Sequence, residues 1–240
     1  MAAHEPGHGP VPDSALHEAG CGEHPAPRDT AEPATGRGTA HRPMRRDAAR
    51  NHQLVIAAAR EVLTEYGTDA SMELIASRAG VGVGTLYRRF PNKEALVDEI
   101  AGQMLGELVG EARGALTLPD GTGLEVFVRV FGRWLSEHRG YADKLVGHTK
   151  AACVEQLRDL IDRLLDQARA AGRVAPHIEL GDVMALVWGL RGVVETSGAV
   201  TPDAWRRHTD IHLAGLRASS PDAAHPAVTR DQLTRINTGG

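Results

Sequence analysis

The stretch GVGVGTLYRRFPNK, Gly80 to Lys93, gathers glycine, hydroxyl, aromatic and cationic residues within fourteen positions. Hydroxyl and cationic groups bind phosphate oxygens, and the same groups reach base edges in a DNA groove. Glycine, with no Cβ, lets a backbone come close to such a ligand. The residues that supply these groups are Gly84, Thr85, Tyr87, Arg88, Arg89 and Lys93. The stretch therefore predicts recognition of a polyanion.

The distribution of charge supports the same prediction. The chain of 240 residues has a net charge of −4, yet residues 41–93 hold nine Lys or Arg against five acidic residues, a local charge of +4. Residues 1–40 and 94–240 each carry −4. A basic segment between acidic flanks indicates that one small part of the protein meets a polyanion and the rest does not.

Helices must position this stretch. An apolar stripe with steps of four, three and four residues predicts a helix over residues 46–66. Ser71 is placed to cap a second helix, which Gly80 ends. A short third helix follows over residues 83–90, and Asn92 caps a fourth. Three apolar residues of the third helix are expected on its buried side: Val83, Leu86 and Phe90.

Two helices joined by a tight turn, the second short and surrounded by donors, form a helix-turn-helix, whose second helix enters the major groove of DNA. The run SMELIASRAGVGVGTLYRRFPNKEALVDEI, preceded by a helix ending in TEYG, resembles the N-terminal DNA-binding domain of the TetR family of bacterial transcriptional regulators. The resemblance covers residues 46–100, and GTLYRRFPNKEAL is its most specific part.

The resemblance implies roles for individual residues. Tyr87 and Lys93 match positions that mostly contact phosphates in the family. The expected DNA contacts are Ser71, Gly84, Thr85, Tyr87, Arg88, Arg89 and Lys93. Arg45 and Arg46, at the start of the domain, are also candidate DNA contacts and have two interpretations, a flexible arm that reaches the minor groove or a solvated hinge.

The rest of the chain predicts an all-α protein. Residues 1–43 are rich in Pro, Gly and His and are expected to be a disordered arm, because they lack the apolar content that ordering requires. Residues 44–92 form the predicted helix-turn-helix domain, residues 93–217 a larger helical regulatory and dimerisation domain, and residues 218–240 a flexible tail. The predicted fold class is thus a three-helix DNA-binding domain joined to a helical ligand-binding and dimerisation domain.

The resemblance implies that the second domain binds a small ligand among its middle helices and dimerises through its last two. The helix near residues 180–196 is apolar on nearly all sides and needs cover that a partner subunit would supply. The expected dimer contacts are Val183, Leu186, Val187, Leu190, Val194, Trp205 and Leu213. The candidate ligand contacts, chosen for their chemical groups, are Phe127, Phe131, Trp134, Tyr141, His148, Cys153 and Trp188.

The cysteine and apolar content of the chain limits the metal sites, disulfides and cellular compartments that can be expected. Cys21 and Cys153 predict neither a disulfide framework nor a zinc site, and Cys153 is expected to be a small buried hydrophobe. The irregularly spaced histidines of the arm predict no metal site, and no cofactor is expected. No window is apolar enough for a membrane span, so a cytoplasmic protein with no membrane partner is expected.

Together these patterns predict a DNA-binding transcriptional regulator. The preferred form is a repressor that binds an inverted-repeat operator in double-stranded DNA as a homodimer and is released by a small-molecule effector. Two alternatives stay open: an activator of the same family, and a helical protein-interaction module without operator binding. An enzyme is disfavoured because the chain has no nucleophile elbow, phosphate loop or metal-ligand spacing.

Overall fold

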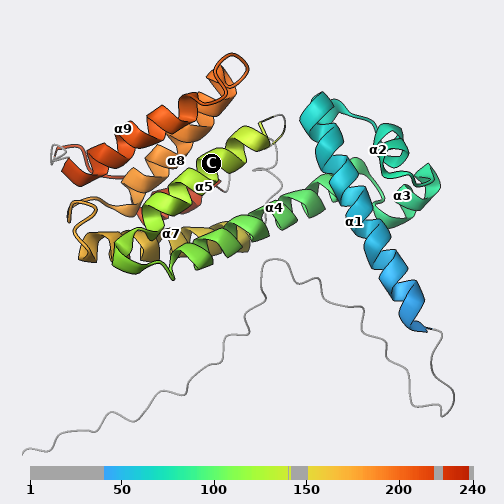
Figure 1. Ribbon diagram of the computed structural model, residues 1–240, viewed down its shortest axis with the longest axis horizontal. Helices are drawn as coiled ribbons and strands as arrows, with labels where there is room; N and C mark the ends of the chain where they lie inside the picture. The colour runs from blue at the N-terminus through green and yellow to red at the C-terminus, as the bar shows by residue number, and fades with distance from the viewer. Residues whose placement is uncertain (1–40, 140, 142–150, 219–223, 238–240) are drawn as a thin grey trace, which may run out of the picture.

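A computed structural model describes residues 41–139, 141, 151–218 and 224–237 of the chain. All regular structure in these residues is helical, so the predicted all-α class is confirmed (Figure 1). The main helices are α1 (His41–Tyr66), α2 (Met72–Ala79), α3 (Val83–Arg89), α4 (Lys93–Ala115), α5 (Gly123–Glu137), α7 (Ala151–Ala170), α8 (Leu180–Ser197), α9 (Ala204–Ala218) and α10 (Arg230–Asn237). None of these described helices combines the length and apolarity that crossing a membrane requires.

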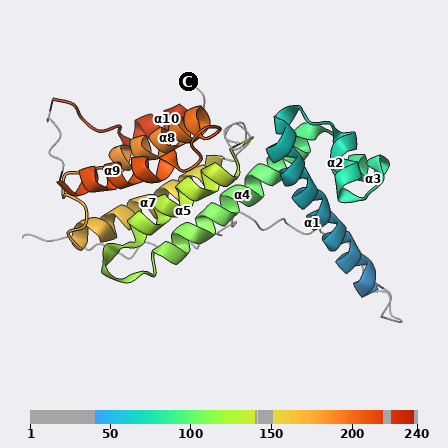
Figure 2. The same ribbon diagram turned by 45° about the horizontal axis from the view of Figure 1, so that its top comes forward.

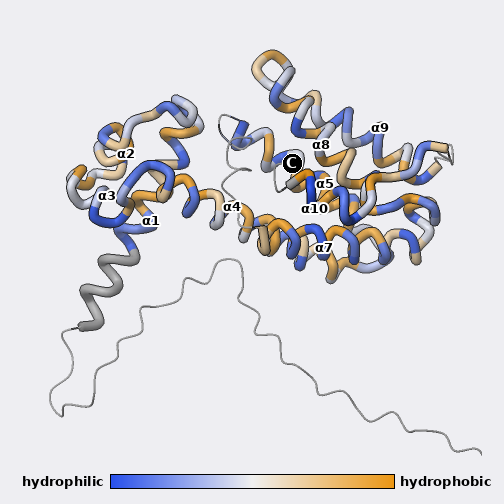
Figure 3. Tube along the Cα trace, turned by 180° about the vertical axis from the view of Figure 1, so that it is seen from behind, coloured by the Kyte–Doolittle hydropathy of each residue, from blue (hydrophilic) through white to orange (hydrophobic). Residues whose placement is uncertain are grey.

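Helix α4 connects two hydrophobic cores. Its first half contributes Ile100 and Met104 to a core shared with α1, α2 and α3, and its second half contributes Leu108 and Ala112 to a core shared with α5, α7, α8 and α9. Figure 1 shows α1–α3 at one end, the bundle of α5 and α7–α9 at the other, and α4 running between them. Figure 3 shows apolar residues along both halves of α4. The two cores therefore divide within α4 rather than at its start.

A row of aromatic rings forms a second connection between the cores. The row runs along α5 and the turn after it and consists of Phe127, Phe131, Trp134, His138 and Tyr141. The centroids of successive rings are 6.3, 6.1, 5.0 and 5.8 Å apart, in that order. Trp134 packs against both cores. Tyr141 lies in the core of α1–α4, where burial raises the pKa of its phenol.

The C-terminal segment returns as α10 to the bundle of α5 and α7–α9, beside α8 (Figure 2). Leu233 is 1% exposed and belongs to the core of this bundle, which is called the regulatory core below after the domain predicted from the sequence. Arg158 of α7, itself 2% exposed, donates to the Leu233 carbonyl at 3.2 Å. Arg230 in turn forms ion pairs with Asp159 and Asp162 of α7. The burial of Leu233 in the core, together with the contacts of Arg158 and Arg230, thus holds α10 on the bundle.

The prediction of a flexible tail over residues 218–240 is therefore wrong for residues 230–237. An eight-residue helix is marginal by itself, and α10 has only two large apolar residues, Leu233 and Ile236, to mark it in the sequence. Its order comes from tertiary contacts with a helix about seventy residues earlier, which local patterns do not reveal.

Helix α1 also begins earlier than residue 46. It starts at His41, so Arg45 and Arg46 lie within a helix and not in the flexible arm or hinge that the sequence suggested. Arg, Met and Ala form helices readily, and Pro43 falls in the first turn, where its missing N–H costs little. Residues 1–40, which hold most of the predicted disordered arm, lie outside the described residues.

Cys153 departs from its predicted chemistry. It is buried, as expected, but it is disulfide-bonded, and its partner lies outside the described residues. The prediction that the two cysteines form no disulfide framework does not hold for Cys153. It relied on the wide spacing of the two cysteines in the sequence, whereas disulfide formation depends on distance in the folded chain.

Candidate nucleic-acid interface

Local capping signals hold α2 and α3 in place. The hydroxyl of Ser71 accepts a hydrogen bond from the Leu74 N–H at 3.2 Å and caps α2. Gly80 ends α2 with a φ of 66°, a left-handed conformation that other residues adopt only with strain. After α3, the Asn92 side chain accepts from the Ala95 N–H at 2.8 Å and caps α4. These predicted starts and stops are confirmed.

Two side chains anchor α3 to the domain. Leu86 is 1% exposed and Phe90 is 5% exposed, and both lie in the core with α1, α2 and α4. The Phe90 ring also stacks on His52 of α1, with centroids 5.8 Å apart. The imidazole of His52 lies 3.4 Å from the Glu99 carboxylate of α4. One side of α3 is thereby fixed against the two long helices.

The opposite side of α3 faces solvent. Thr85, Arg88 and Arg89 are exposed, and Tyr87 is 43% exposed. Val83 is 41% exposed, so the prediction that it packs inward with Leu86 and Phe90 is wrong. Gly82, the N-cap of α3, and the first two residues of the helix are all exposed.

The cations of this surface lack carboxylate partners. Within the described residues Arg88, Arg89 and Lys93 form no salt bridge, although Arg88 donates to the Thr85 hydroxyl at 3.0 Å. Other arginines of the domain differ: Arg60 donates to both Glu107 carboxylate oxygens at 2.8 and 2.9 Å.

Arg78 of α2 is neutralised in the same way. It donates to the Glu65 carboxylate at 2.8 Å, and this hydrogen bond lowers the pKa of Glu65. Among the described side chains of the domain, the cations without a salt bridge are therefore Arg50 of α1 and the group Arg88, Arg89 and Lys93 at α3 and the start of α4.

Known proteins match both parts of the chain. A profile described as bacterial regulatory proteins, tetR family, matches residues 55–100, and one described as transcriptional regulator SbtR-like, C-terminal domain, matches residues 119–218. The solved TetR transcriptional regulator SCO0520 from Streptomyces coelicolor is 31% identical, with a TM-score of 0.54 over 70% of this chain and 99% of that one. The chain belongs to the TetR family.

Two further similarities agree with membership of the TetR family. The TetR transcription regulatory protein from Mycobacterium vanbaalenii is 31% identical, with a TM-score of 0.57 over 73% of this chain and 100% of that one. The uncharacterized HTH-type transcriptional regulator YhgD of Bacillus subtilis is 42% identical over 65 residues, or 27% of this chain. That match spans only 34% of the length of this curated relative. The chain is thus a TetR-family transcriptional regulator with a helix-turn-helix DNA-binding domain.

The side chains predicted as dimer contacts lie in the core of their own subunit. None of them is more than 6% exposed. They are Val183, Leu186, Val187, Leu190, Val194, Trp205 and Leu213. Helices α5, α7, α9 and α10 of the same chain supply the cover that α8 needs. Little surface of these side chains is left for a partner, so their burial does not support the predicted dimer contacts.

The predicted ligand contacts lie in different parts of the described structure. Phe127, Phe131, Trp134 and Tyr141 belong to the aromatic row. Trp188 is half-buried against the regulatory core, Cys153 is buried, and His148 lies outside the described residues. These seven residues stay a prediction.

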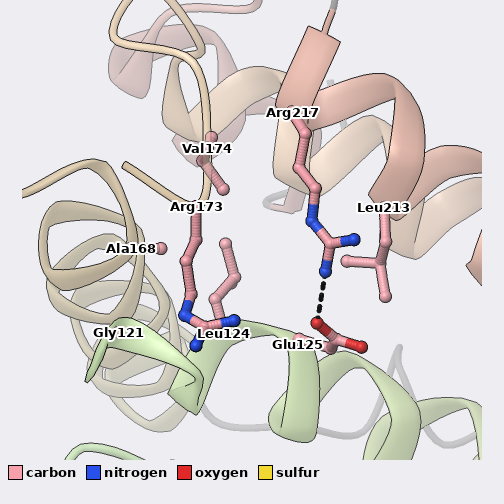
Figure 4. Close-up of a pocket in the computed structure, with 8 residues that line it drawn as sticks. All are labelled: Gly121, Leu124, Glu125, Ala168, Arg173, Val174, Leu213 and Arg217. Atoms are coloured by element: carbon pink, nitrogen blue, oxygen red, sulfur yellow. Dashed lines mark hydrogen bonds and ion pairs between the residues drawn. The ribbon is translucent and has the colours of Figure 1, made fainter. Parts of the chain in front are cut away.

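A shallow pocket lies elsewhere, between α5, α9 and the end of α7 (Figure 4). Its lining contains none of the predicted ligand contacts. The lining residues are Gly121, Leu124, Glu125, Ala168, Arg173, Val174, Leu213 and Arg217. Arg217 donates to the Glu125 carboxylate at 2.6 Å, and Arg173 donates to the Asp120 carbonyl, so both cations already have partners.

Proposed function

We propose that this protein is a transcriptional repressor that binds an inverted-repeat operator as a homodimer and leaves it when a small molecule binds. The observation that carries the proposal is the outward side of α3. Tyr87 and Arg89 project from a short helix whose opposite side is locked into the core, and Lys93 begins the next helix. Such a helix docks in the major groove, with its cations on the flanking phosphates.

A second copy is part of the proposal because one short helix reads too few base pairs for specific binding. The exposed sides of α8 and α9 suit a two-fold interface. Ala185 and Gly192, one heptad apart on α8, are exposed, as is Ala214 on α9, and such small residues let helices approach closely. Ile211 of α9 is 56% exposed and supplies an apolar contact. A two-fold axis would set this surface against itself.

An effector would act through the elements that both cores share. Helix α4 and the aromatic row connect the regulatory core to α1, and the bond between Arg60 and Glu107 fixes α1 on α4. A ligand that binds one arrangement of these elements more tightly shifts the population toward it. Release from DNA is the direction we propose, and activation is the alternative.

The first experiment measures fluorescence anisotropy with duplexes that carry the inverted repeats near the gene, over a range of salt concentrations. Each phosphate contact contributes about 0.9 to the slope of log K against log salt. We expect tight, salt-dependent binding to one repeat, and a slope smaller by about 1 for Arg89→Ala.

The matched control is Arg113→Ala, which removes an exposed arginine near the end of α4. This variant should leave both affinity and slope unchanged. Equal effects of the two variants would show that the charge of α3 has no special role. Binding no tighter than to random DNA would favour the helical interaction module instead.

A further inference from the structure

The outward side of α3 carries an apolar ridge, Val83 and Tyr87, that the described part of the chain leaves exposed. Val83 and Tyr87 lie one turn apart and are 41% and 43% exposed. Gly84 lies beside them, and a Cβ placed there would meet no atom within 4 Å. The buried side of α3 already has its anchors in Leu86 and Phe90, so the exposure of Val83 serves no packing purpose within the subunit.

The polar groups nearest to this ridge are partly occupied. The Thr85 hydroxyl oxygen accepts a hydrogen bond from Arg88 at 3.0 Å, which folds the guanidinium back along the helix. Gly82 and Gly84 have no side chains, so Val83 is the only side chain that the first two residues of α3 and the residue before them present. The side chains at the start of α3 therefore offer a base edge an apolar surface and no side-chain donor.

The groups on the major-groove edges of the bases indicate which base an apolar surface can recognise. Among the four bases only thymine has an apolar group on its major-groove edge, the C5-methyl, and the other edges show donors and acceptors. A valine against a donor or acceptor would leave that group without a hydrogen bond, which is unfavourable. Phosphate contacts from Arg89 and Lys93 would position the helix without specifying a base.

We propose that Val83 is a specificity-determining residue that reads the C5-methyl of one thymine in each operator half-site, with the bare backbone at Gly84 giving the base room to approach. The inference depends on the proposed operator binding and adds the base chemistry to it.

The test replaces thymine by deoxyuridine, which removes the methyl and keeps every hydrogen-bonding group. An operator selected from randomised duplexes is prepared with this change at each thymine pair in turn, and anisotropy gives the Kd. Burial of one methyl corresponds to about fourfold in affinity, so we expect about a fourfold loss for one half-site and about 15-fold for both, at one symmetric position.

The protein variants complete a double-mutant cycle. In Val83→Ser the loss caused by deoxyuridine should disappear, while Val200→Ser, at a valine that is 85% exposed outside α3, should keep the full loss. A specific operator whose deoxyuridine forms all bind like the parent would overturn the inference and leave the proposed function standing. An unchanged loss in Val83→Ser would assign the methyl to another residue. Failure to select any sequence would overturn both proposals.

Discussion

Replacement of Leu233 by alanine tests whether α10 is an integral part of the fold. Leu233 is 1% exposed in the regulatory core, and truncating a buried leucine costs about 2–5 kcal/mol. Helix α10 has eight residues at the edge of the bundle and can detach, so the loss cannot exceed the free energy of its docking. We expect the lower end of that range, about 2–3 kcal/mol. In a chain of this size that corresponds to a Tm lower by about 4–12 °C.

Ile236→Ala is the matched control for this prediction. It removes a side chain of similar size from the same helix, but Ile236 is 52% exposed. Thermal melts should show almost no change for Ile236→Ala, and hydrogen exchange should speed up along α10 in Leu233→Ala alone. Equal, small effects in both variants would refute the docked position of α10 and return residues 230–237 to a flexible tail.

Two other stability predictions follow from close contacts and from burial. Gly132→Ala should lower the Tm, because the added Cβ would lie 2.5 Å from the Trp205 ring. The control Gly110→Ala, at a helical site with open space around it, should raise the free energy of unfolding by about 0.5–1 kcal/mol. A Gly132→Ala variant with an unchanged Tm would contradict the packing of α5 on α9. Burial, and then the charge of His212, lower the pKa of His208 from 6.5. The unfolded chain therefore binds this proton more readily, and stability falls as pH drops below about 6.5. Melts at pH 7.5 and 5.5 should show a smaller acid loss for His208→Leu, and equal losses would exclude this titration.

The helix-turn-helix could be predicted closely because its signals are local. Ser71, Gly80 and Asn92 each set a boundary within a few residues of themselves, through a cap or a left-handed turn. Leu86 and Phe90 were also predicted correctly as buried residues. Val83 was not, since helical periodicity gives the direction of a side chain but not the extent of the core that it faces.

Long-range packing limited the predictions for the second domain. Sequence periodicity showed that α8 is apolar on most sides. It could not show whether the helices that bury these sides belong to the same chain or to a partner subunit. Val183 and Leu190 are fully buried within one subunit, and Leu233, from a helix of only eight residues, helps to bury α8. Contacts of this kind join residues far apart in the sequence, and only the folded chain reveals them.

The docking of α10 gives the synthesis of this protein a definite order. Arg158 is translated 75 residues before the carbonyl of Leu233 that receives its hydrogen bond. At elongation rates of about 5–20 residues per second this interval lasts about 4–15 s, and until α10 docks the guanidinium of Arg158 lacks this acceptor. The regulatory domain thus reaches its final form only when the last helix arrives. A chain terminated after α9 would leave two surfaces exposed to other proteins. One is the hydrophobic site that Leu233 fills, and the other is the set of charged residues on α7 that α10 contacts.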